Sequence, residues 1–185
     1  MLKNLKTSTR AYRINAMDTY ADGPNCKKQA PKQIVYANEE KCGGMPDSME
    51  IAIGARIMLR RNIDTARGLV NGSFGTITGI EWSLLSRDQL ETGTLPDSIL
   101  VKFDDDEIAK NFTDKLGDSI RIKPHSVTFE GKKGTHITRR MLPIILSWAI
   151  TIHKTQGLTL TKAIVCLEGC FGYNMEYVAL SRIKT

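Results

Sequence analysis

The 185-residue chain lacks several features by which enzymes and membrane proteins are recognised. It has no apolar run long enough to span a bilayer, and no signal-peptide order of charged, apolar and small residues near its start. We therefore expect a soluble, intracellular protein. Aromatic residues make up only 6% of the chain, whereas 41% hydrophobic and 25% charged residues are ordinary for a globular protein with a core. The length fits one medium domain, or one domain with a smaller insertion.

Complete catalytic motifs are also missing. There is no G-x-x-x-x-G-K-[ST] phosphate-binding loop, because "GKKG" at 131–134 has neither the upstream glycine nor the Ser or Thr. The zinc-protease motif HExxH and the hydrolase motif GxSxG do not occur. The stretch "ILVKFDDDE" at 99–107 resembles a strand that delivers acids to Mg²⁺, but without a phosphate loop ahead of it a strand ending in a solvated turn is favoured. The chain alone assembles no complete active site.

Metal-binding residues are few and scattered. The chain has four cysteines and three histidines: Cys26, Cys42, Cys166, Cys170, His125, His136 and His153. No two cysteines have the close spacing of a zinc knuckle, so we expect free thiols and no metal site.

Positive charge is present in excess. The chain has 26 basic and 20 acidic residues, a formal net charge of +6. Between positions 121 and 140 six basic residues face a single acid, Glu130: Arg121, Lys123, Lys132, Lys133, Arg139 and Arg140. Such clustering attracts phosphates, although a solvated hairpin face has the same pattern. Both interpretations stay open.

Local patterns predict many short strands. Residues 1–50 are polar and irregular, with "RINAMD" and "QIVYANEE" as the strand-like pieces. "MEIAIGARIMLRRNI" is β-branched and apolar, and Asn71-Gly72 is a tight-turn signal that precedes a strand over 76–81. "SILVKFDD" predicts a further strand, and "SIRIKPHSVTFEGKKGTHITRR" predicts two or three more around the "GKKG" turn. Short strands with glycine punctuation over 68–140 indicate a small β-barrel.

The last 45 residues have a different pattern. "LPIILSWAITIHKTQG" predicts a buried strand that runs into a helical turn, and "KAIVCLEG" predicts a strand buried on both faces of a parallel sheet. "NMEYVALSRIKT" predicts a helix with Asn174 as its N-cap and a buried apolar stripe at Tyr177, Val178 and Leu180. This succession of elements is typical of an α/β layer.

Two segments carry candidate functional residues. In "TIHKTQG", a strand-to-helix turn would place Thr151, His153, Lys154 and Thr155 at a sheet edge, where hydroxyls, backbone N–H groups and a cation can contact a phosphate. A plain surface turn is the alternative. In "YVALSR", Arg182 follows a short helix and could act as an arginine finger, although a helix-terminal arginine that caps its own helix is the simpler explanation.

Taken together, the two segments resemble motifs V and VI of superfamily-one DNA helicases. The order "WAITIHKTQGLTL", about twenty residues, then "YVALSR" is most similar to the petite-integration-frequency (Pif) family, including its copies in Helitron transposons. "GARIMLRRNIDTARGLVNGSFGTI" at 54–77 resembles the family's conserved strand and turn, and "RRMLPIILSWAITIHKTQG" its lead-in to motif V, with Met141 and Leu142 in place of the usual Gln-Phe. The likeness covers roughly residues 50–185.

The resemblance implies an α/β fold: part of a RecA-like motor domain with an inserted small SH3-like β-barrel. Its expected divisions are an irregular lead-in and start of the second RecA-like domain at 1–50, a motor-domain strand segment at 51–67, the barrel at 68–140, and the C-terminal part of the second RecA-like domain, with motifs V and VI, at 141–185. The glycines of "NGSFG" are expected to be structural, and Asn62 to order a loop.

The resemblance also implies roles for single residues. Arg182 would stabilise the γ-phosphate of ATP, and Gln156 and Gly157 would couple nucleotide state to DNA grip. Thr151, His153 and Lys154 would contact the backbone of single-stranded DNA. These six residues are the predicted site.

The implied function is that of an ATP-dependent, 5′-to-3′ DNA helicase acting in DNA repair and recombination, in the nucleus or mitochondrion. The family's phosphate loop, magnesium-binding acids and first RecA-like motor domain have no counterpart here, so we expect a C-terminal portion of a helicase. ATP and Mg²⁺ would be bound in the complete helicase and not by this chain alone, which we expect to be inactive and to hold no stable small-molecule ligand. The alternative is a non-catalytic module that binds single-stranded nucleic acid.

Overall fold

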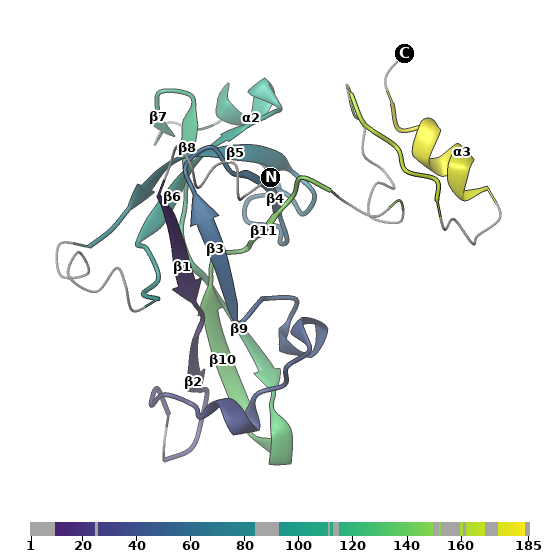
Figure 1. Cartoon of the computed structure of the whole chain (residues 1–185). Coiled ribbons are helices and arrows are strands. Elements are labelled where there is room, and N and C mark those ends of the chain that lie inside the picture. Colours follow the sequence, from purple (N-terminus) through teal and green to yellow (C-terminus); the bar gives the residue numbers. More distant parts are fainter. Residues whose placement is uncertain are drawn as a thin grey trace. The chain divides into compact units, whose positions relative to one another are not determined.

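A computed structural model describes residues 10–24, 26–83, 93–110, 112, 115–149, 152, 160, 162–168 and 174–183 (Figure 1). The chain divides into two compact units, 1–146 and 147–185, called here the N-terminal unit and the C-terminal unit. Within the described residues, no helix is both long and apolar enough to cross a membrane.

A six-stranded antiparallel sheet forms the centre of the N-terminal unit, in the order β11-β4-β5-β6-β8-β7. Its strands are β4 (Arg56–Leu59), β5 (Phe74–Glu81), β6 (Ser98–Phe103), β7 (Lys115–Leu116), β8 (Ser119–Ile122) and β11 (Ile144–Leu146). Branched aliphatic side chains from these strands are buried and form the core, among them Ile57, Leu59, Ile77, Ile99, Val101, Ile120 and Ile144. Residues with a branched Cβ favour this pleated, buried setting.

Glycine and asparagine fix the turn before β5, as the sequence predicts. Gly72 has a φ of 98°, which a side chain would disfavour. The side-chain oxygen of Asn62 accepts a hydrogen bond from the backbone N–H of Asn71 at 2.8 Å, so Asn62 orders the loop as expected. Gly75 lies directly against β6, where a Cβ would come within 2.6 Å of Val101 Cγ1. The prediction that the "NGSFG" glycines are structural is confirmed at these two positions.

Two smaller antiparallel sheets use residues near the start of the chain. β1 (Ala11–Asn15) pairs with β3 (Ser48–Ala52), and β2 (Met17–Tyr20) joins a three-stranded sheet in the order β2-β10-β9, with β9 (His125–Glu130) and β10 (His136–Met141). The strand prediction for "RINAMD" is therefore confirmed.

The prediction of a strand for "QIVYANEE" is wrong. The segment forms parts of two short 3-10 helices, η1 (Lys32–Ile34) and η2 (Glu39–Cys42). Pro31 precedes η1, and the side chain of Asn38 accepts a hydrogen bond from Glu40 N at 2.8 Å at the start of η2. Asparagine in this position stabilises a helical turn, which overrides the strand preference of Ile and Val.

A buried arginine links two strands of the three-stranded sheet through hydrogen bonds. Arg139 on β10 is 2% exposed, and its Nε and Nη2 donate to the two carboxylate oxygens of Asp18 on β2, each at 2.8 Å. Its Nη1 donates to the carbonyl oxygen of Met45 at 2.8 Å. Burial lowers the pKa of Arg139, but the hydrogen bonds to Asp18 outweigh this and raise it. One side chain thus joins β10, β2 and the segment that follows η2.

The strand pairings also test the predicted barrel. Among the described residues the edge strands β11 and β7 are not paired with each other, so the six-stranded sheet is open and the predicted closed barrel is not formed. The reason is that β9 and β10, which cover most of 125–141, form a separate sheet in which β10 pairs with β2. The described part of the chain is rich in sheet with few helices, and the boundaries at 50, 67 and 140 remain predictions.

Candidate functional site

Arg182 lies just beyond α3 (Met175–Leu180), the short helix of the C-terminal unit. Asn174 occupies the predicted N-cap position, but with a φ of 64° its side chain makes no capping hydrogen bond. Arg182 is half-buried, and its Nε donates to the carbonyl oxygen of Val178 at 3.3 Å. A cation over the last turn of a helix is favourable, so Arg182 caps its own helix here. This is the simpler of the two sequence-based interpretations, and it does not by itself exclude the other.

The backbone of Arg182 is joined to Leu160, which follows the predicted DNA-contacting segment in the chain. The N–H of Leu160 donates to the carbonyl oxygen of Arg182 at 2.8 Å, and Leu160 forms a parallel bridge with Ile183. The hydrogen bond brings two segments that are over twenty residues apart into direct contact. It lies three residues after Gly157 and on the peptide of Arg182 itself.

The other predicted site residues lie outside the described residues. Thr151, His153, Lys154, Gln156 and Gly157 are all in this group, so their positions and their grouping with Arg182 remain predictions.

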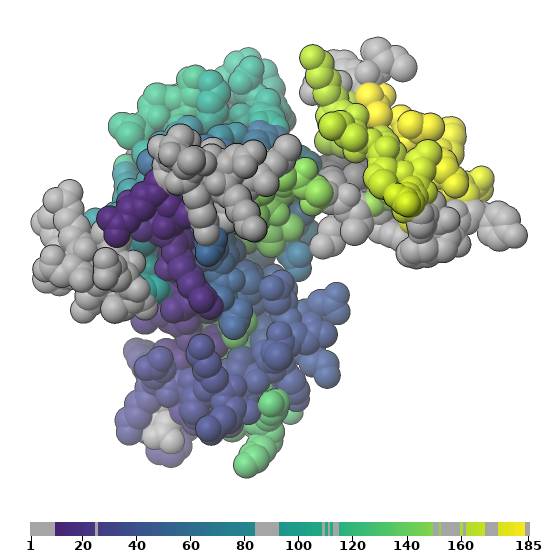
Figure 2. All heavy atoms as spheres, in the orientation of Figure 1, coloured from purple at the N-terminus to yellow at the C-terminus, as the bar shows by residue number. Residues whose placement is uncertain are grey.

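Apolar side chains are exposed in the C-terminal unit. Leu167, Tyr177 and Leu180 are 41%, 73% and 55% exposed, and Ile164 is fully exposed. Figure 2 shows residues 162–168 (yellow-green) and α3 (yellow) on the visible surface of this unit. The buried strand predicted for "KAIVCLEG" is not formed over 163–168, because no described strand lies beside this segment to form backbone hydrogen bonds with it. The predicted buried stripe at Tyr177 and Leu180 is also wrong; Ala179 is the buried residue of α3.

The acidic turn after β6 has a structural role. Asp104 accepts hydrogen bonds from Arg56 Nη1 and Nη2 at 2.6 and 2.5 Å, which raise the pKa of Arg56. Asp105 Oδ1 accepts from the N–H of Glu107 at 3.0 Å at the start of α2 (Asp106–Lys110). No group of three His, Cys, Asp or Glu side chains that could hold a metal ion occurs in the described part of the chain. The strand predicted for "ILVKFDDDE" is formed as β6 and ends in this acidic turn.

The basic cluster of 121–140 is partly neutralised within the fold. Arg121 donates to Glu81 through Nε at 2.7 Å and Nη2 at 2.8 Å, and this pair, with a hydrogen bond from Ser98, lowers the pKa of Glu81 to about 2. Arg139 is buried against Asp18. Lys132 and Lys133, in contrast, are exposed at the β9–β10 turn, η4 (Lys132–Gly134). Lys123 and Arg140 are exposed as well, so four of the six basic residues remain at the surface.

Sequence reasoning missed basic residues that fold against this turn. Lys27, Lys28 and Lys32 come from the first quarter of the chain, and no local pattern connects them with Lys132 and Lys133. The pairing of β2 with β10 brings them to one end of the sheet.

Comparison with known proteins finds similar sequences among DNA helicases. The family model "DNA helicase Pif1, 2B domain" matches residues 36–80, on both sides of the boundary predicted at residue 68. The ATP-dependent DNA helicase PIF1 of Xenopus laevis is 34% identical over 136 residues, which are 74% of this chain and 18% of that protein. PIF1 of Homo sapiens is 32% identical over 137 residues, which are 74% of this chain and 18% of that protein. PIF6 of Trypanosoma brucei brucei is 31% identical over 150 residues, which are 80% of this chain and 17% of that protein. The chain thus spans less than a fifth of the length of these relatives.

Solved structures show the same relationship. The Pif1 helicase from Candida albicans superposes with a TM-score of 0.63 at 26% identity, covering 98% of this chain and 39% of that one. A Bacteroides Pif1 helicase in complex with ADP-AlF3 and ssDNA superposes with a TM-score of 0.57 at 23% identity, covering 100% and 36%, and this likeness concerns the fold alone. By its ordered sequence motifs, its relatives and its fold, the chain belongs to the Pif1 family of DNA helicases.

Proposed function

We propose that this chain is the part of an ATP-dependent DNA helicase that joins nucleotide sensing to movement along single-stranded DNA in the 5′-to-3′ direction. Residues 141–185 would complete the second RecA-like motor domain, and the N-terminal unit would include its SH3-like insertion. The first motor domain, with ATP and Mg²⁺, would lie outside this chain. Such a helicase would act in DNA repair and recombination in the nucleus or mitochondrion. Membership of the Pif1 family supports this proposal.

The hydrogen bond between Leu160 N and Arg182 O is the observation that carries it. Residues 151–157, which precede Leu160, hold the predicted DNA contacts, and Arg182 is the predicted nucleotide sensor. A movement of the Arg182 backbone is passed to the DNA-contacting segment through one peptide hydrogen bond and a short stretch of chain. The two functions therefore share one backbone connection.

Arg182 has the chemistry for the role. A guanidinium carries five N–H donors, and the one side-chain hydrogen bond that Arg182 makes among the described residues uses Nε. At 3.3 Å to Val178 O this bond is long, so an oxygen of a negatively charged γ-phosphate can compete for the side chain. Bound in the first motor domain, ATP and Mg²⁺ would supply the transferring phosphoryl group. Arg182 would leave its helix cap and place its charge beside that group.

The exposed apolar side chains support a partner for the C-terminal unit. Ile164, Leu167, Tyr177 and Leu180 are large apolar side chains that remain exposed in this unit. A motor-domain segment from outside this chain would cover them.

Hydrolysis of ATP by the isolated chain is the first test. We expect no turnover above background, because an arginine finger without a phosphate cradle and metal acids has nothing to act on. Turnover that is lost in Arg182→Ala would overturn this expectation.

A chimera tests the proposal itself. This chain would replace the matching segment of the Xenopus laevis helicase, and DNA-stimulated ATP hydrolysis would be measured for Arg182, Arg182→Lys and Arg182→Ala. We expect both variants to bind ATP but to lose about a thousandfold in turnover, since lysine lacks the planar fork of arginine. An active chimera that is indifferent to Arg182→Ala would refute the role of Arg182.

The alternative of a non-catalytic binding module gives a different result. It predicts salt-sensitive binding of single-stranded DNA by the isolated chain, lost in Lys154→Ala, together with an inactive chimera. Affinity that does not change between low and moderate salt would exclude it.

A further inference from the structure

Five lysines gather at one end of the three-stranded sheet and are called here the lysine tip: Lys27, Lys28, Lys32, Lys132 and Lys133. The backbone holds the first two there, because Lys27 N donates to Tyr20 O at 2.9 Å and Tyr20 N donates to Lys28 O at 3.0 Å. Tyr20 is the last residue of β2 and lies opposite Ile137 on β10. The segment around Lys27 is thus fixed beside the start of β10.

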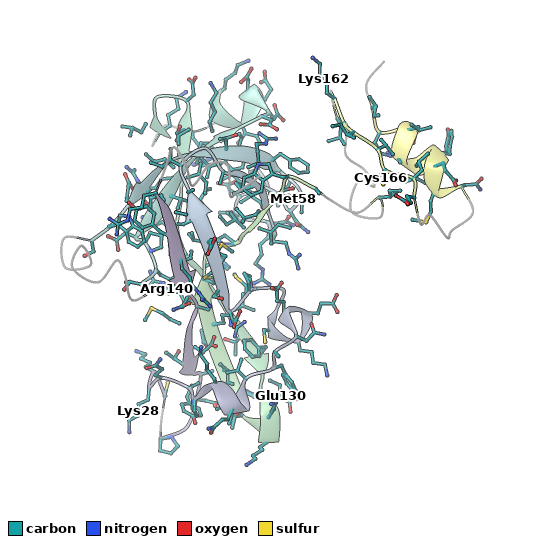
Figure 3. All side chains as sticks on the ribbon, viewed as in Figure 1. Lys28, Met58, Glu130, Arg140, Lys162 and Cys166 are labelled. Atoms are coloured by element: carbon teal, nitrogen blue, oxygen red, sulfur yellow. The ribbon has the colours of Figure 1, made fainter. Side chains whose placement is uncertain are left out.

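The other three lysines are held in the same region. A Cβ on Gly131 would come within 2.9 Å of the carbonyl oxygen of Ile34, so the β9–β10 turn packs directly against η1. Lys32 begins η1, and Lys132 and Lys133 form the turn. Figure 3 shows Lys28 and Glu130 at the same end of the N-terminal unit, away from Met58 in the six-stranded sheet.

The tip carries a concentrated positive charge. Over residues 21–36 and 130–136 there are five lysines and two acids, Asp22 and Glu130, a net of three positive charges out of the chain's +6. Asp22 also faces His136, whose Nδ1 lies 3.3 Å from its carboxylate. The tip is therefore a local source of positive potential, which attracts polyanions.

Two of these lysines occupy strained backbone positions. Lys27 and Lys133 have φ values of 64° and 61°, and within the described residues the only other non-glycine residue with positive φ is Asn174. A left-handed conformation costs a lysine on the order of 1 kcal/mol, and glycine would avoid that cost. Both positions carry an exposed positive charge despite that cost.

The described aromatic residues of the tip, Tyr20, Tyr36 and Phe129, are partly buried. Its aromatic residues pack against a small core of Ala30, Val35, Cys42 and Ile137. Lys41 lies 5.0 Å from the ring centre of Tyr36, and the guanidinium of Arg139 lies 5.7 Å from that of Phe129, so cations cover these two rings. Proteins that bind single strands stack bases on exposed aromatic rings. The ammonium groups of the tip can bind phosphates, whereas its covered rings are poorly placed to stack bases. This combination suits duplex DNA, in which the bases are already stacked on one another.

We propose that the lysine tip binds the sugar-phosphate backbone of double-stranded DNA. This site consists of other residues than the predicted single-strand contacts Thr151, His153 and Lys154. It rests on the proposed function only in taking DNA as the partner. Lysines contact phosphates without reading bases, so the binding is independent of sequence.

The test compares duplex and single-stranded DNA with the intact chain and no nucleotide. Fluorescence anisotropy would follow a labelled duplex of about 20 base pairs and a single strand of equal length, between about 50 and 200 mM salt. In the triple variant Lys27→Gln, Lys132→Gln, Lys133→Gln we expect duplex affinity to fall at least about tenfold at low salt and the salt slope to fall by about 2 to 3. Affinity for the single strand stays within about twofold.

The charge-matched control changes Lys102, Lys110 and Lys115 to Gln, at the α2 and β7 end of the unit (Figure 1). It loses the same net charge, and duplex affinity should change by less than about threefold. A control that weakens binding as much as the tip variant would overturn the proposal, and so would a tip variant with unchanged duplex affinity. Equal losses for duplex and single strand would also overturn it, in favour of a single-strand site.

Lys133→Gly separates charge from folding. Glycine relieves the strained backbone, so this variant should be at least as stable as the parent while binding duplex about threefold more weakly. Lys133→Arg should keep the parent affinity. A Lys133→Gly protein with full duplex affinity would contradict the proposal. If the chain binds neither form of DNA, the proposed function fails; if only the tip dependence is absent, this inference alone fails.

Discussion

The buried pair of Arg139 and Asp18 gives the sharpest prediction for stability. The two side chains are 2% and 14% exposed, so neither charge can be hydrated when its partner is removed. Asp18→Leu would leave the guanidinium with its bond to Met45 O as its remaining hydrogen bond among the described residues. We expect this change to cost about 3–5 kcal/mol of unfolding free energy. Arg139→Met should cost a similar amount, because it leaves the carboxylate alone.

The double variant Asp18→Leu, Arg139→Met should be less damaging than the sum of the two. No buried charge remains, and the cost reduces to the unpaired carbonyl of Met45, about 1–3 kcal/mol. The coupling energy between the two positions is therefore expected to exceed about 2 kcal/mol. The exposed pair of Arg56 and Asp104, 35% and 51% exposed, is the control and should couple by less than about 1 kcal/mol.

Urea unfolding followed by the reactivity of the Cys42 thiol measures this directly. Cys42 is fully buried, its Sγ donates to Tyr36 O at 3.2 Å, and burial raises its pKa, so the folded protein protects it from thiol reagents. Replacing the other three cysteines by serine makes the signal specific to this part of the chain. If both single variants and the double variant unfold at the same urea concentration, Arg139 and Asp18 do not stabilise the fold as a pair.

Three further changes test other parts of the fold by the urea midpoint of the N-terminal unit. Gly75→Ala would place a methyl group 2.6 Å from the nearest side-chain atom of β6 and should cost about 2 kcal/mol of unfolding free energy. Gly117→Ala, with no heavy atom within 4 Å, should cost about 1 kcal/mol for its φ of 62° alone. Equal costs for the two variants would show that β6 moves aside for the added methyl group. Glu81 has a pKa lowered from 4.5 to about 2 by Arg121, so its stabilisation is complete above pH 4.5 and is lost as the pH falls toward 2. Glu81→Gln should remove that part of the acid dependence, about 1 kcal/mol after allowance for solvent screening of the pair, and an unchanged acid profile would contradict it. Asn62→Ala removes the hydrogen bond that orders its loop and should cost about 1 kcal/mol, with no loss expected if the loop is held elsewhere.

The elements that the sequence predicts well are those whose cause is local. The turn at Asn71-Gly72, the strand after it and the acidic turn after β6 depend on neighbours a few residues away. Their turn residues and alternating apolar residues are visible in the sequence itself. The ordering role of Asn62 belongs to the same class, since its partner is nine residues away.

What the sequence could not predict depends on distant partners. The pairing of β2 with β10 brings Thr19 and Thr138 together across 119 positions, and no period or motif connects them. The open sheet follows from that pairing, because it takes β9 and β10 away from the predicted barrel. The apolar segment 163–168 has the composition of a buried strand, but composition cannot supply the neighbouring strands that would bury it. For the candidate site, the position of Arg182 after a short helix was predictable, whereas its bond to Leu160 was not.

The pairing of β2 with β10 also determines an order of folding. β5, β6 and β8 lie within residues 74–122 and pair with one another, so this part of the sheet can form while the rest is still being synthesised. β2 must wait until residues 136–141 have left the ribosome, because its partner strand and the arginine that neutralises Asp18 are both there. β2 is therefore among the last strands to be paired, although it is the second in the chain, and until then it presents an unpaired edge to which other chains can add.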